Sequence, residues 1–178
     1  MYLQKLMLTL KIPKEIYNKG NKQLWEELTH AHQYNFPQEY MDFIDIYGTG
    51  SIGDFLWILN PFENNNENIN LFEKSKIMRD SYNYLKKNHP KDFKYSIYPD
   101  DNGLFPWALT DNGDELYYDT AGNIVVVMPS RCRDSDALIY EMDIAEFLYK
   151  LLMNEIHCDC FSAQDFCGIS IEYQPVKF

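Results

Sequence analysis

Long apolar runs are absent from the sequence, and cysteine is scarce. A membrane-spanning helix needs about 20 consecutive apolar residues, and no stretch of the 178 residues approaches that composition. The first fifteen residues, MYLQKLMLTLKIPKE, contain only a short apolar stretch and no small-residue cleavage site of the kind that a secretory signal requires. With four cysteines and no secretory signal, we expect a cytoplasmic protein with reduced thiols and no membrane association.

A standard metal-binding motif is also absent. His157, Cys158, Cys160 and Cys167 provide four soft side chains near the end of the chain. However, a C-x-C pair followed by six residues and one further cysteine is not a standard zinc spacing. We therefore favour ordinary thiols over a metal site, and we expect no metal and no cofactor.

The sequence lacks common catalytic signatures such as G-x-S-x-G and H-E-x-x-H. Two of its four histidines, His30 and His32, are two residues apart on an expected helix, so they point to different faces. Four carboxylates cluster around an expected hairpin turn, namely Asp111, Asp114, Glu115 and Asp119. Acid–base catalysis needs environments that separate the pKa values of such groups, whereas exposed turn carboxylates more often bond to the local backbone. We therefore do not expect an enzyme.

Basic residues are scarce in the second half of the chain. The formal net charge is -11, and residues 96–178 contain 15 acidic and 4 basic side chains, which accounts for all of it. The electrostatic field of this negative charge repels phosphate backbones and anionic lipid, and it attracts basic partners. We therefore expect no nucleic-acid binding. A basic protein partner and a solvated acidic face that maintains solubility both remain open.

Aromatic side chains, in contrast, are abundant, with 14 Tyr and 11 Phe available for a core. The apolar periodicity predicts an α+β fold, in which a mainly antiparallel sheet with a central meander packs against helices in a single domain. We expect strands at 5–12, 54–59, 104–110, 114–119, 123–128, 136–141 and 168–174. We expect helices at 21–32, 37–47 and 68–88, and a last helix that begins at Asp143. Helices are expected to cover the sheet mostly on one side.

Residues 47–55, YGTGSIGDF, contain Gly48, Gly50 and Gly53 in the G-x-G-x-x-G spacing of dinucleotide-binding loops. Such a loop follows a strand and precedes a helix, so that the helix N-terminus faces the pyrophosphate. Here the expected helix comes first and the expected strand follows. We therefore interpret Gly48 as a helix C-cap and the other glycines as a tight reversal into the strand, with no nucleotide site.

Three stretches of the sequence carry a family resemblance. They are FPQEYMDFIDIYGTGSIGDFLWILNPF at 36–62, YPDDNGLFPWALTDNGDELYYD at 98–119 and EFLYKLL at 146–152. Together, and in this order, they resemble the signature of the SUKH superfamily, which contains yeast cell-wall-assembly regulators and bacterial immunity proteins. The match covers about 22–155, so it leaves an extra N-terminal strand in 1–20 and a C-terminal extension in 156–178. The resemblance implies a SUKH-like domain that binds another protein.

The resemblance implies an immunity protein that neutralises a cognate toxin, or alternatively a non-enzymatic regulatory or scaffold protein of the cell-wall-assembly type. For an immunity protein, the acidic charge favours a basic nuclease toxin as the partner. We expect the contact to involve aromatic side chains rimmed by carboxylates. The candidate residues are Asp100, Asp101, Trp107, Asp111, Asp114, Glu115, Tyr117 and Asp119. Strand alternation places about half of the aromatic residues inside, and we expect Trp107 to be buried.

Overall fold

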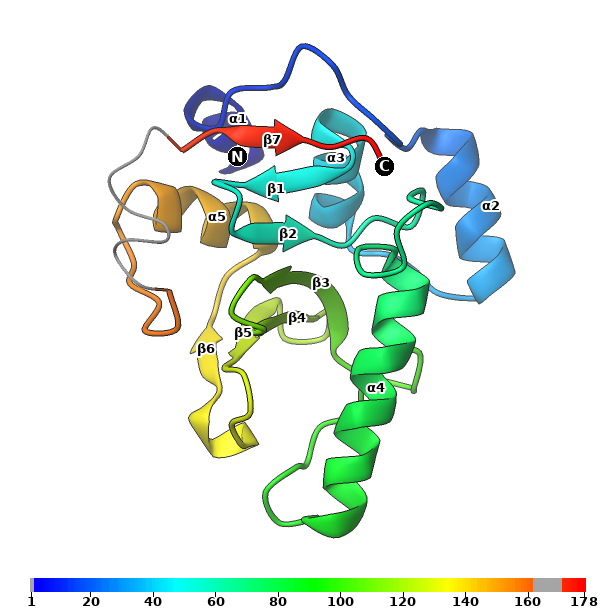
Figure 1. Ribbon diagram of the computed structural model, residues 1–178, viewed down its shortest axis with the longest axis vertical. Coiled ribbons are helices and arrows are strands. Elements are labelled where there is room, and N and C mark those ends of the chain that lie inside the picture. The colour runs from blue at the N-terminus through cyan, green and yellow to red at the C-terminus, as the bar shows by residue number, and fades with distance from the viewer. Residues whose placement is uncertain (1, 162–170) are drawn as a thin grey trace.

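The computed structural model of the protein describes residues 2–161 and 171–178 (Figure 1). The helices in the described part are α1 (Tyr2–Thr9), α2 (Lys22–His32), α3 (Gln38–Tyr47), α4 (Leu71–Asn88), α5 (Ile144–Leu152) and the short 3-10 helix η1 (Asp134–Asp136). The strands are β1 (Gly50–Ile52), β2 (Leu56–Ile58), β3 (Phe105–Thr110), β4 (Glu115–Asp119), β5 (Ile124–Met128), β6 (Leu138–Tyr140) and β7 (Tyr173–Pro175).

The strands form one antiparallel sheet in the order β6-β5-β4-β3-β2-β1-β7. From β1 to β6 each strand pairs with the next one in the chain, so this part of the sheet is a meander. Figure 1 shows β7, β1 and β2 one below another in the upper half of the molecule, with α4 running down one side. The expected α+β fold with an antiparallel meander is confirmed.

The first secondary-structure element is a helix, so the expected strand at 5–12 is wrong. Leu6 and Leu10 are fully buried, whereas Leu8 between them is 90% exposed, which is the four-residue spacing of a helix face. This helix, α1, packs against α5, where the ring of Tyr2 lies 5.7 Å from that of Tyr149. The spacing of Leu6 and Leu10 fits both the two-residue period of a strand and the four-residue spacing of a helix face. The local sequence is therefore ambiguous, and packing against α5, which is far away in the sequence, favours the helix.

The glycine-rich stretch forms the expected corner between a helix and a strand. Gly48 ends α3 with a φ of 67°, and its N–H donates to the carbonyl of Ile44 at 2.9 Å. Gly50, in contrast, lies within β1, a short strand that the sequence did not predict. A Cβ at Gly50 would lie 2.2 Å from the carbonyl oxygen of Gln174, so this glycine lets β7 pair closely with β1. The C-terminal segment is therefore part of the sheet rather than an appendage.

Helices cover both faces of the sheet at β3 and β4, contrary to the expectation of cover mostly on one side. Phe105 and Tyr118 are register partners and share a face, on which the ring of Phe105 lies 5.0 Å from that of Tyr40 in α3. Glu115 faces the other way because side chains alternate along a strand. It lines a cavity together with Tyr82 of α4. Cover on both faces also explains why the central residues of β5 are all buried.

Among the described residues, no helix combines the length and the apolar composition that crossing a bilayer requires.

Candidate interaction surface

The structure divides the eight candidate contact residues into three groups. Asp111, Asp114 and Glu115 lie at the turn between β3 and β4. Asp100, Asp101 and Asp119 lie at the opposite end of the same two strands, and Trp107 and Tyr117 lie in the core. A six-residue strand is about 20 Å long. The eight residues therefore do not form the single face that the sequence suggested.

Two carboxylates at the β3–β4 turn accept hydrogen bonds from neighbouring residues of the protein. Asp114 is only 5% exposed and accepts hydrogen bonds from the hydroxyl of Thr110 at 2.7 Å and the N–H of Ser130 at 2.9 Å. Asp111 is exposed, but it accepts from the indole N–H of Trp57 at 2.7 Å. The expectation that these carboxylates are exposed is wrong for Asp114, which is tied to the start of the next loop, and for Glu115, which is half-buried.

The two aromatic candidates are core residues in this structure. Trp107 is 1% exposed and lies 6.3 Å, between ring centroids, from Phe147 of α5. Tyr117 is fully buried, and its hydroxyl donates to the carboxylate of Glu115. Trp107 is buried as expected, and neither ring presents surface to a partner. The aromatic-rimmed contact face is therefore absent from this part of the described structure.

The remaining candidates belong to a larger acidic surface. The pairing of Phe105 with Tyr118 sets the start of β3 beside the end of β4. The pairing of Val125 with both Tyr118 and Tyr140 adds the start of β5 and the end of β6 to the same end of the sheet. The turns and helix ends at this end of the sheet carry six carboxylates, which we call the acidic end: Glu39, Asp100, Asp101, Asp119, Glu141 and Asp143.

The pKa of the Tyr118 hydroxyl reflects both burial of the ring and the negative charge of the acidic end. Its pKa rises to about 12, first because the ring is buried, and then because the charges of Glu39, Asp143 and Asp119 disfavour the phenolate. These three carboxylates come from α3, from the N-cap of α5 and from the last residue of β4. Three elements that are far apart in the sequence therefore converge at one negative surface.

The carboxylates of the acidic end are not paired with basic side chains of the described residues. In the parts of the chain that the structure describes, none of its six carboxylates forms an ion pair with Lys, Arg or His. Asp119 accepts from the N–H of Ala121, and Asp143 accepts from the N–H of Glu146, so these two also hold local structure. Asp100, Asp101 and Glu141 are exposed to solvent. An incoming cation would meet unpaired carboxylates there.

Three members of the acidic end were not predicted. Glu141 and Asp143 follow the expected sixth strand, so pairing the strands in a meander could have located them from the sequence. Glu39 lies in the first 60 residues, which are close to neutral, and only the packing of α3 against the sheet brings it to this surface.

The cysteines of the C-terminal region do not assemble a metal site among residues 2–161 and 171–178, where no group of three potential ligands is close enough to hold an ion. Cys158 is buried, and Cys160 is half-buried beside it. His157 is exposed and lies 3.3 Å from the carboxylate of Asp159. The fourth candidate ligand, Cys167, lies outside the described residues.

Comparison with known proteins does not assign a family: no protein-family model, no curated protein and no solved structure matches the chain. The features that bear on function are therefore the sequence motifs of residues 36–152 and the charge distribution of the surface.

Proposed function

We propose that the protein is an immunity protein that binds and neutralises a cognate toxin, a basic nuclease, in the cytoplasm. The observation that carries the proposal is the acidic end, where six carboxylates gather and none forms an ion pair with a described residue. The SUKH resemblance suggests the class of protein, and the charge suggests the chemistry of the partner.

The physical reason is electrostatic complementarity. A nuclease needs a basic groove to hold a phosphate backbone, and a surface of unpaired carboxylates attracts that groove from a distance. Complementary charge raises the association rate and disfavours acidic partners. An inhibitor that must act before its toxin damages nucleic acid gains directly from fast association.

The proposal is tested by co-expression. The candidate toxin is the product of the gene next to the one that encodes this protein, placed under an inducible promoter in a bacterial host. We expect colony counts to collapse on induction, and co-expression of the full chain to restore them. Purified protein is also expected to inhibit the nuclease activity of the purified toxin at equimolar concentration.

Two results would contradict the proposal. One is a toxin that kills equally well with and without the protein, although both are expressed in soluble form. The other is the recovery, in affinity purification from the native host, of several signalling or cell-wall proteins and no toxic partner. That second result would favour the regulatory or scaffold function.

A further inference from the structure

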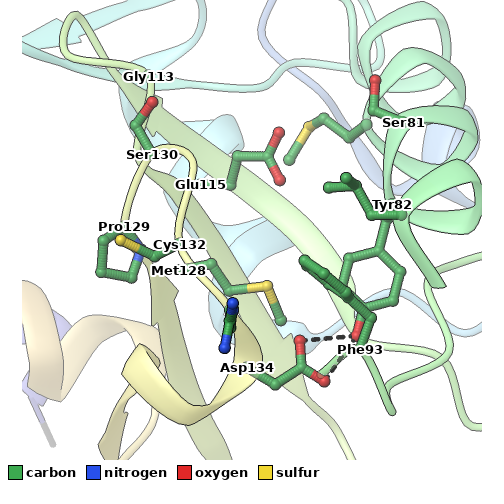
Figure 2. Close-up of a pocket in the computed structure, with 13 residues that line it drawn as sticks. Ser81, Tyr82, Phe93, Gly113, Glu115, Met128, Pro129, Ser130, Cys132 and Asp134 are labelled. Atoms are coloured by element: carbon green, nitrogen blue, oxygen red, sulfur yellow. Dashed lines mark hydrogen bonds between the residues drawn. The ribbon is translucent and has the colours of Figure 1, made fainter. Parts of the chain in front are cut away.

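A small cavity lies between α4 and the face of the sheet that α4 covers (Figure 2). Its volume is about 100 Å³. The lining residues that matter here are Met78, Tyr82, Phe93, Glu115, Met128 and Asp134. Figure 2 shows the carboxyl group of Glu115 directed from β4 toward α4, on which Ser81 lies. None of these six residues belongs to the acidic end, so the cavity is a separate feature.

Two carboxylates line this cavity, and both are held in place. Both oxygens of Asp134 lie 2.8 Å from the hydroxyl of Tyr82, which in turn accepts from the N–H of Tyr95 at 2.9 Å. Glu115 accepts from the hydroxyl of Tyr117. Burial raises the pKa of Glu115, because the surrounding protein disfavours its charged form. A cation that entered the cavity would relieve this penalty.

The rest of the lining also suits a cation. The rings of Tyr82 and Phe93 meet edge to face, with centroids 5.5 Å apart and planes at 84°. Aromatic faces attract cations, and more strongly when the site is dry. Met78 and Met128 add polarisable thioethers that adapt to the shape of an inserted group. The cavity thus combines carboxylates, ring faces and apolar walls.

Among the described residues, one basic side chain lines the cavity, and it forms an ion pair with a carboxylate outside the lining. Arg133 lines the cavity, but its Nε lies 3.7 Å from the carboxylate of Asp92. The charge of Lys74 in α4 acts to lower the pKa of Glu115, but the two side chains do not form an ion pair. The carboxylate of Glu115 is therefore available to a cation from outside.

We propose that this cavity receives the guanidinium group of one arginine side chain of the protein's partner. This inference rests on the proposed function and deepens it by naming an anchor residue. Small-molecule sites usually have about 300–1,000 Å³, and a 150 Å³ cavity just holds benzene, so 100 Å³ suits one narrow side chain. Arginine fits better than lysine because its planar, weakly hydrated head stacks on rings and pairs with carboxylates. Arginine is also enriched among residues that dominate binding energy.

The test uses n-butylguanidinium as a probe of the cavity, with no need of the partner. The full chain is labelled with ¹³C at the methionine methyl groups and titrated while NMR spectra are recorded. We expect saturable shifts at the methyls of Met78 and Met128, and none at those of Met41 and Met153, which do not line the cavity.

The variant Glu115→Gln removes the charge with little change in size, and we expect it to weaken the probe's affinity about tenfold. The matched control is Asp111→Asn, which makes the same charge change in the same hairpin but outside the cavity; it should bind the probe as the wild type does. A second variant, Ser81→Phe, obstructs the cavity without altering its charge and should abolish the shifts.

Shifts at Met41 or Met153 without shifts at Met78 and Met128, or equal affinity in Glu115→Gln and in the wild type, would overturn the arginine pocket. If Glu115→Gln fails to give a folded spectrum, unchanged binding in Ser81→Phe would overturn it in the same way. Either failure leaves the immunity proposal standing, because toxin rescue is measured independently. Conversely, probe binding without toxin rescue would establish a cation site and contradict the immunity proposal.

Discussion

At the scale of single residues, Glu115 shows how a neighbouring element changes the chemistry of a turn carboxylate. In the sequence it is one of several acidic residues around Asn112-Gly113, and strand alternation alone places it on the face of Tyr117. What the sequence could not show is that α4 covers this face, which half-buries Glu115 and raises its pKa.

This burial predicts a pH dependence of stability. A carboxyl group with a raised pKa binds more protons in the folded than in the unfolded protein between its two pKa values. Its contribution to stability is therefore fully present below its unfolded pKa, near 4.5, and is lost as the pH rises through its folded pKa. The difference in the free energy of unfolding between wild type and Glu115→Gln should fall across this window and then level off. Urea titrations at a series of pH values measure it, and a constant difference would contradict the assignment.

At the scale of elements, most helix ends were predictable because capping residues mark them. Asn21 and Asp143 cap α2 and α5 by accepting from the N–H three residues on, and Gly48 ends α3 in the conformation that favours glycine. The errors concern short elements. β1 has three residues, too few for any period to show, and α1 has a pattern that fits two periods.

The helical α1 predicts opposite effects for two leucines that the strand interpretation places on one side. Leu6→Ala should lower the free energy of unfolding by about 2–5 kcal/mol, because it leaves a cavity in the core. Leu8→Ala should change it by about 0.5 kcal/mol or less, because Leu8 is 90% exposed. Denaturant unfolding of the two variants measures both values. Similar losses for the two would contradict the helix.

The close approach of β7 to β1 predicts a local effect of a substitution at Gly50. Gly50→Ala places a Cβ against the carbonyl of Gln174 and should cost about 1–3 kcal/mol through overpacking. Amide exchange of Val176, whose N–H donates to the carbonyl of Thr49 at 3.0 Å, should become faster than in the wild type.

Ser51→Ala is the control, because the buried hydroxyl of Ser51 has no hydrogen-bond partner among the described residues and its loss leaves the β1–β7 ladder intact. Unchanged exchange of Val176 in Gly50→Ala would show that β7 does not depend on this glycine.

At the scale of the whole molecule, the sequence predicted the sign and size of the charge but not its location. The excess in residues 96–178 was visible by counting. The β3–β4 hairpin was the expected location of this negative charge, yet the side chains of Asp114 and Glu115 turn inward. Strand pairing instead brings unpaired carboxylates together at the other end of the sheet. The location of charge on the surface depends on tertiary contacts, which local sequence patterns do not encode.

We propose that the acidic end binds the basic partner, and the rate at which the protein associates with the purified toxin is the decisive measurement. Stopped-flow measurements over a range of ionic strength compare the wild type with a triple variant of exposed acidic-end residues, Asp100→Asn, Asp101→Asn and Glu141→Gln. A matched triple variant carries Glu26→Gln, Glu27→Gln and Asp80→Asn, at exposed positions on α2 and α4.

We expect the wild-type association rate constant to fall steeply with added salt, and the acidic-end variant to associate about tenfold more slowly at low salt. The matched variant should stay close to the wild type. A rate that does not depend on salt, or equal losses in the two triple variants, would contradict the acidic end as the binding surface.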